Sequence, residues 1–181
     1  MPDDAAFQRK VMGRAFSLLG SEAPTVVDYD VVIDDENPEV LMCPLPARMD
    51  PNAHPALDEA RGLRPAYDRA VKKYGNRAGA ARLLDADAIP AAIEAFVRVA
   101  HGKPWKEAGI PGIPARVSQD IRGYYEMAAM EIAGHTPAAW AGFRWFRDHT
   151  RTGEIIRAAR DAMRDSGAKE PLWRFLMPSD S

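Results

Sequence analysis

Residues 66–100 read AYDRAVKKYGNRAGAARLLDADAIPAAIEAFVRVA, and this stretch decides the predicted fold. The pair Gly75-Asn76 ends one helix, and residues 77–84 predict a short second helix rich in alanine and leucine. A turn at residues 85–87 leads into a further helix, predicted from Ala88 to Ala100. Two short helices joined by a tight turn, with small residues where they approach, predict a helix-turn-helix unit.

Seven residues next to this break carry a recognisable pattern. They are Gly75, Asn76, Ala80, Ala81, Arg82, Leu83 and Leu84. The pattern resembles the helix-turn-helix of Fis-type bacterial DNA-binding domains, and with the helix that follows it covers residues 66–100. The resemblance implies a nucleic-acid-associated or regulatory protein.

The predicted helix at residues 88–100 is apolar on both faces. One face carries Ile93, Phe96 and Val97, and the opposite face carries alanines and Val99. Because a helix that is apolar all round is usually buried, we expect it to serve core packing or a homodimer contact more than base reading.

Charge is unevenly distributed along the chain. Residues 1–60 carry 4 basic and 12 acidic side chains, whereas residues 61–122 carry 12 basic and 6 acidic side chains. The basic block coincides with the helix-turn-helix candidate, which is the pattern that phosphate neutralisation needs. The expected phosphate contacts are Arg69, Lys72, Lys73, Arg77 and Arg82. An alternative is that this basic face docks against the acidic N-terminal part of the same chain.

The rest of the chain predicts a mainly α, multi-helix single domain with a short N-terminal β element. A helix is expected over residues 5–19, a strand over residues 25–33 with a short partner at 38–42, and a proline-rich arm over residues 43–56. We therefore divide the chain into an acidic segment, residues 1–56, and a helical domain, residues 57–181.

Proline and glycine punctuate the helical part. Helices resume near Pro55, with an interruption around Gly62 and Pro65. Later helices are expected from Pro114 to Gly134, from Pro137 onward, and from a Thr152 cap to Gly167. A loop at residues 102–114 and an apolar tail at 171–177 that packs back on the body complete the prediction.

A second candidate site lies in the last third of the chain. Arginines interleave with aromatic residues there, and a turn at Thr150 to Gly153 leads into a helix N-terminus that could hold an anion together with Arg151. The candidate ligand-binding residues are Arg144, Arg147, Arg151, Glu131, His135 and His149. This group favours an alternative function, a small-ligand-binding or enzymatic helical domain.

Several classes of protein receive no support from the sequence. There is no apolar run long enough to span a membrane, and a single cysteine fits a reducing compartment, so we expect a cytoplasmic protein without a membrane partner. There is no HExxH sequence, cysteine pair, phosphate loop or nucleophile elbow. We therefore expect no metal site and no cofactor, and the catalytic residues of any enzyme remain unknown. A structural subunit of a larger assembly is the third possible function.

Overall fold

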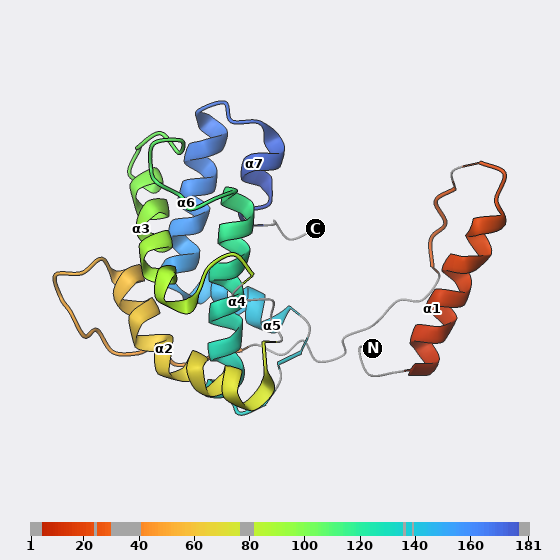
Figure 1. The fold of residues 1–181 in the computed structure, drawn as a ribbon, viewed down its shortest axis with the longest axis horizontal. Helices are drawn as coiled ribbons and strands as arrows, with labels where there is room; N and C mark the ends of the chain where they lie inside the picture. The colour runs from red at the N-terminus through yellow and green to blue at the C-terminus, as the bar shows by residue number, and fades with distance from the viewer. Residues whose placement is uncertain are drawn as a thin grey trace. The chain divides into compact units, whose positions relative to one another are not determined.

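The computed structural model describes residues 5–23, 25–29, 41–76, 82–135, 137, 138 and 140–177. It confirms the mainly α class, with seven α-helices among these residues (Figure 1). The chain divides into two compact units, Met1–Pro38 and Glu39–Ser181. The proline-rich arm, residues 43–56, therefore falls in the same unit as the helical body.

The first unit contains α1 (Ala5–Ser17) followed by the short 3-10 helix η1 (Leu18–Gly20). The ring of Phe7 contacts the ring of Tyr29 edge to face, with centroids 6.3 Å apart. The predicted β element is not seen within the described residues: residues 25–29 form no strand, and residues 30–33 and 38–40 lie outside the described part of the chain. A strand needs a hydrogen-bonded neighbour, and Val26 is 97% exposed.

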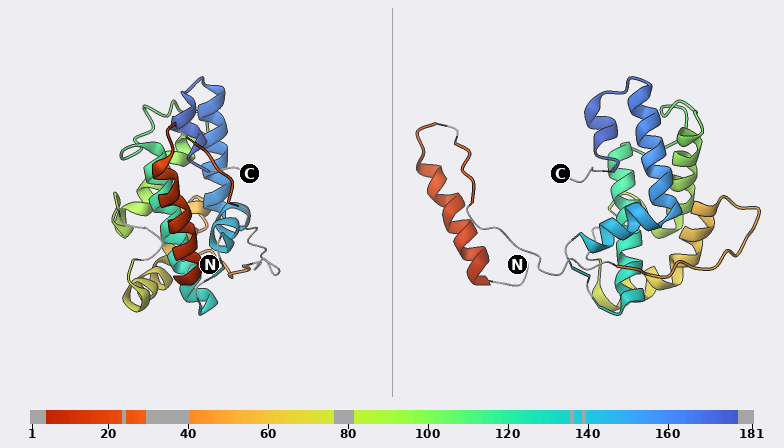
Figure 2. Two further views of the ribbon diagram at one scale, coloured as in Figure 1. Left: turned by 90° about the vertical axis from the view of Figure 1, so that its right-hand side faces the viewer. Right: turned by 180° about the vertical axis from the view of Figure 1, so that it is seen from behind.

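The second unit is a group of packed helices. They are α2 (Pro55–Tyr74), η2 (Ala86–Ala88), α3 (Ile89–Ala100), α4 (Pro114–Ala133), α5 (Ala141–His149), α6 (Arg151–Asp165) and α7 (Glu170–Arg174). Helix α2 packs against α4, α3 packs against α6, and α5 contacts both α4 and α6. Figures 1 and 2 show α2 lying across one end of this group.

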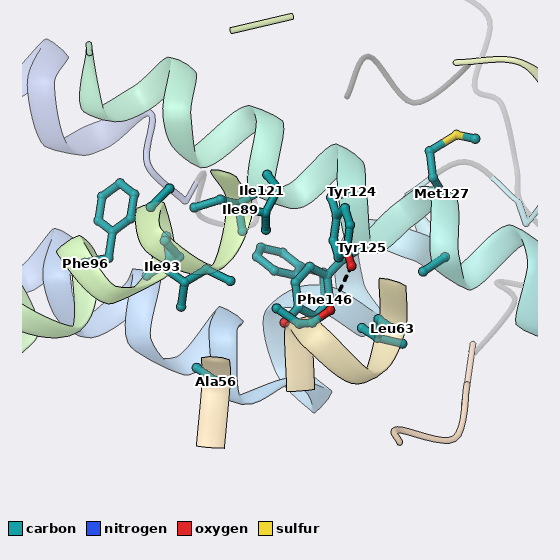
Figure 3. Packing of buried hydrophobic residues seen from close by; sticks show 14 of the residues in the cluster. Ala56, Leu63, Ile89, Ile93, Phe96, Ile121, Tyr124, Tyr125, Met127 and Phe146 are labelled. Carbon is teal, nitrogen blue, oxygen red and sulfur yellow. Dashed lines mark hydrogen bonds between the residues drawn. The ribbon is translucent and has the colours of Figure 1, made fainter. Parts of the chain in front are cut away.

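The core confirms the prediction that the apolar helix serves core packing. In α3 the side chains of Ile93 and Phe96 are fully buried, and Figure 3 shows them among side chains from α4 and α5. Only Ala91 and Glu94 of α3 are classed as exposed. This narrow strip leaves little apolar surface for a second copy, so the structure gives no support to the homodimer contact.

The helix predicted over residues 77–84 is wrong at its described end. Residues 77–81 lie outside the described part of the chain, and residues 82–84 form a bend instead of a helix. The backbone N–H groups of Leu83 and Leu84 each donate to the buried carboxylate of Asp120 in α4, at 2.7 Å, and that of Arg82 does so at 3.4 Å. This carboxylate takes donors that a helix would have used internally.

Helix α2 runs through the interruption predicted at Gly62 and Pro65. Pro65 is exposed, so water can solvate the carbonyl group that loses its helical partner. Gly62 is a packing position, because a Cβ atom there would lie 2.6 Å from side-chain carbons of Pro46 in the arm. The glycine thus lets the arm lie close against α2.

The last helices begin at residues other than those predicted. Helix α5 starts at Ala141 rather than near Pro137, and Thr150 instead of Thr152 caps α6, with its hydroxyl accepting from the N–H of Gly153 at 2.9 Å. Helix α4 does run from Pro114 to its left-handed Gly134, and the tail packs back with Leu176 and Met177 buried. Both of these expectations are confirmed.

Candidate functional site

A cavity of about 560 Å³ opens in the second unit, where the arm, α2, the end of α3 and the first turn of α6 meet. Its wall combines a few apolar side chains with acidic, basic and imidazole groups. The lining residues are Leu45, Pro46, Arg48, His54, Pro55, Asp58, Glu59, His101, Arg151, Glu154 and Ile155. A concave site of this size with converging polar groups is the usual form of a small-ligand site. We call it the His54 pocket.

Asp58 fixes the arm along one side of the His54 pocket. Its buried carboxylate accepts from Arg48 Nε at 3.0 Å and from the backbone N–H groups of Met49 and Asp50 at 2.8 and 3.1 Å. Burial alone would raise the pKa of Asp58, but these hydrogen bonds and the guanidinium of Arg48 lower it below its ordinary value. Asp58 is therefore an ionised anchor for the arm.

Glu59, the next residue, occupies the N-terminus of α6. Its Oε2 accepts from the N–H of Arg151 at 2.9 Å, and its Oε1 accepts from the N–H of Thr152 at 3.2 Å and from the hydroxyl of Tyr125 at 2.9 Å. Burial raises the pKa of Glu59 despite these donors. The helix N-terminus predicted to hold an anion thus holds a carboxylate of the protein itself.

His54 caps α2 from the edge of the pocket. Its Nδ1 accepts from the N–H of Ala56 at 3.2 Å, so the neutral ring carries its proton on Nε2. Burial, with the nearby His101 and Arg48, lowers the pKa of His54. The ring centroids of His54 and His101 lie 6.1 Å apart. His54 is therefore a hydrogen-bond donor to the pocket and not a general base, because its free lone pair serves the cap.

Arg151 and Glu154 form the exposed pair on the α6 side. Arg151 NH1 lies 3.1 Å from Glu154 Oε2, and the two side chains are 67% and 60% exposed. An exposed pair of this kind contributes little to stability. Both side chains are consequently free to exchange partners.

The chemistry of the His54 pocket favours binding through hydrogen bonds and charge. Within the described residues there is no group of three or more histidine, cysteine or acidic side chains placed to hold a metal ion.

No helix in the same part of the chain is long and apolar enough to cross a membrane.

The structure distributes the six residues of the arginine-rich candidate site over several places. Only Arg151 lines the His54 pocket. Arg147 of α5 pairs with Asp148 and lies over the ring of Phe143. Arg144 lies on the same helix, His149 is exposed at its end, and His135 is exposed beyond α4. Glu131 pairs with Arg69, at 3.0 Å.

The basic candidates lie on and after α2. Lys72 and Lys73 are exposed in its last turn, and Arg82 is exposed in the bend that follows. Arg69 is 61% exposed but pairs with Glu131, so part of its charge is neutralised within the protein. Arg77 lies outside the described residues. These side chains do not line the His54 pocket.

The sequence reasoning missed most of the pocket. Arg48 and His54 belong to the arm, and Asp58 and Glu59 follow within the first turns of α2. A histidine directly before Pro55 could have indicated a helix cap, because proline favours the first helical turn. No local pattern pairs Glu59 with a helix that begins 92 residues later.

Comparison of the chain with protein-family models, curated proteins and solved structures finds no match. Its function is therefore argued from the geometry of the His54 pocket and of the basic face of α2.

Proposed function

We propose that the second unit is a small-ligand-binding helical domain and that the His54 pocket is its binding site. The observation that carries this proposal is the convergence of Arg48, His54, His101 and Arg151 on one cavity of about 560 Å³. Sites for small molecules are concave, lined partly by apolar side chains, and oriented by a few polar groups. The His54 pocket is concave and of suitable size, and it is more polar than most such sites, because seven of its eleven lining residues carry charged or imidazole groups.

The supports of the pocket favour a preformed site. Asp58 joins the arm to α2, and Glu59 joins α2 to the start of α6, so three walls of the pocket are connected by part-buried hydrogen bonds. A site whose walls are already ordered loses less conformational entropy when a ligand binds.

A thermal-shift screen of small carboxylates, phosphates, amines and sugars tests this proposal. A compound that binds only the folded state raises the melting temperature. Leu45 lines the pocket and is 37% exposed, so Leu45→Trp should obstruct the cavity with little effect on the core. We expect any stabilising compound to lose its effect in this variant.

Met42→Trp is the matched control. Met42 lies three residues before Leu45, is 67% exposed and does not line the pocket, so this variant should respond like the wild type. If Leu45→Trp and wild type respond equally to every stabilising compound, binding occurs elsewhere and the proposal is wrong.

Nucleic-acid binding on the basic face of α2 is a second proposal. The exposed Lys72, Lys73 and Arg82 favour it, because phosphate contacts need accessible cations that keep their charge. In this proposal the buried α3 supports the surface from within, and sequence-independent phosphate contact replaces base reading.

Salt dependence tests the second proposal. Changing Lys72, Lys73, Arg77 and Arg82 to glutamate should abolish binding to duplex DNA, and four lost phosphate contacts correspond to about 3 to 4 units of log–log salt slope. A variant with four other exposed basic residues, Lys103, Lys106, Arg164 and Lys169, changed to glutamate controls for net charge. Absence of wild-type binding at about 50 mM salt would remove the nucleic-acid proposal.

A further inference from the structure

We propose that the His54 pocket binds a small organic oxyanion, a carboxylate or a phosphate ester, and that Arg151 is its charge partner. In the unliganded protein, Arg151 pairs instead with the carboxylate of Glu154, which the ligand would replace. This inference rests on the proposed function, because it names the ligand class of the same pocket.

The two buried carboxylates of the pocket are already engaged by donors of the protein. Asp58 accepts three hydrogen bonds, one of them from the guanidinium of Arg48. Glu59 also accepts three, from two backbone N–H groups and a tyrosine hydroxyl. Three of the about four acceptor positions of each carboxylate are thereby used by the protein, so a cationic ligand would compete with hydrogen bonds that already hold the fold.

The Arg151–Glu154 pair is the one that a ligand can replace at low cost. The two side chains are three residues apart on the first turn of α6 and mostly exposed, so their interaction is weak. An oxyanion in the pocket offers Arg151 the same oxygen chemistry as Glu154, and Arg151 lines the pocket, so the two compete for one guanidinium. Glu154 then turns toward solvent.

His54 supplies a neutral donor beside this charge. Because its Nδ1 accepts from Ala56, the remaining ring N–H belongs to Nε2, and the ring lines the pocket. A neutral N–H donor orients an anionic oxygen without the cost of burying another charge. The volume of about 560 Å³ exceeds that of a single phosphate or carboxylate group, which leaves room for an organic body against Leu45 and Ile155.

Titration calorimetry or NMR titration at low salt tests this inference with four probes of similar size. Succinate and glycerol phosphate are the two anions, putrescine is the cation, and glycerol is the neutral compound. We expect one or both anions to bind and the other probes to bind more weakly. The ratio of succinate to glycerol phosphate affinity distinguishes a carboxylate site from a phosphate site.

Substitutions on α6 make the test specific. Arg151→Gln should weaken anion binding by about tenfold or more, since it removes a charged hydrogen bond. Arg151→Lys should restore part of the affinity. Glu154→Gln should tighten binding by about two- to fivefold, because it removes the competing carboxylate. Arg157→Gln, which removes a charge from α6 outside the pocket, should change nothing.

The outcomes separate this inference from the proposed function. If putrescine or glycerol binds and Leu45→Trp blocks it, while the anions do not bind, the pocket is a ligand site but not for oxyanions. If anions bind equally well to wild type and Arg151→Gln, or if Glu154→Gln weakens them, the role of Arg151 is wrong. If neither these probes nor any compound of the thermal-shift screen binds, the proposed function is overturned as well.

Discussion

Asp58 and Glu59 are neighbours on α2, both buried, and each accepts three hydrogen bonds, yet their pKa values move in opposite directions. Asp58 receives one donor from a guanidinium and two from the backbone. Glu59 receives backbone and hydroxyl donors, and no cationic side chain donates to it among the described residues. Burial is the largest cause for both residues and raises both pKa values, but for Asp58 the two backbone N–H donors and Arg48 together outweigh it, whereas the donors to Glu59 do not.

The two residues also join different parts of the unit. Asp58 holds an arm only eight to ten residues away in sequence, whereas Glu59 holds a helix start 92 residues away. A short loop costs little entropy to close, but the long connection is fixed only in the folded state. Glu59 should therefore matter more to the stability of the whole unit.

The largest effect is expected for Glu59→Ala. It leaves the N–H groups of Arg151 and Thr152 without their acceptor and leaves the hydroxyl of Tyr125 with Thr152 as its remaining partner, so we expect a loss of about 3 kcal/mol in the free energy of unfolding. Urea denaturation measures this value. Glu59→Gln keeps one acceptor oxygen and should cost about half as much. Equal stability of Glu59→Ala and wild type would contradict the bridging role of Glu59.

Asp58→Asn should have a smaller effect, a loss of about 2 kcal/mol, because the amide keeps one acceptor but loses the charge that pairs with Arg48. Arg48 is 44% exposed, so water can solvate it once the partner is gone. The same denaturation experiment applies. Limited proteolysis of residues 48–53 should also become faster in this variant, and unchanged proteolysis would show that Asp58 does not hold the arm.

The pH dependence of the two variants should be opposite in sign. Asp58 has a lowered pKa, so its contribution is present above 3.8 and is lost as the pH falls through the folded value. Glu59 has a raised pKa, so its contribution is present below 4.5 and is lost as the pH rises through the folded value. The stability gap between wild type and Glu59→Gln should shrink from pH 4 to pH 7. The gap between wild type and Asp58→Asn should shrink only below pH 3.8. If the two stability gaps changed with pH in the same direction, the opposite pKa shifts of Asp58 and Glu59 would be contradicted.

Local patterns predicted the parts of the fold that local forces determine. The apolar run around Ile93 and Phe96 predicted a buried helix, and Pro114 and Gly134 marked the two ends of α4, because hydrophobic periodicity and backbone conformation act within a few residues. Residues 82–84 read equally well as helix. The backbone N–H groups of these residues instead donate to Asp120, 36 to 38 residues away, and local helix propensity carries no information about so distant a contact.

The pocket was harder to predict because contacts between distant parts of the sequence also bring its residues together. Arg151 was recognised because it lies in a visible turn before a helix, but the N–H groups of that turn belong to Glu59. Arg48 and His54 lie in an arm that looked like a linker, since four prolines in residues 43–56 suppress helix and strand signals. The hydrogen bonds to Asp58 and the packing of Pro46 against Gly62 bring this arm to the site, and neither contact can be recognised in a local pattern.

The smallest expected effect concerns His54, which lines the same pocket as the two carboxylates and also responds to pH. Its pKa is lowered, so its contribution to stability is present above 6.5 and is lost as the pH falls through the folded value. The physical cause is the cap, because a protonated Nδ1 cannot accept from Ala56.

His54→Ala should cost about 1 kcal/mol at pH 7.5, whereas His54→Asn should keep most of the cap. We expect the stability gap between wild type and His54→Asn to move against the wild type between pH 7.5 and pH 5.5. His101→Asn should weaken this change, since the neighbouring ring helps to lower the pKa of His54. A gap that stays constant over this range would show that the helix cap does not depend on neutral His54.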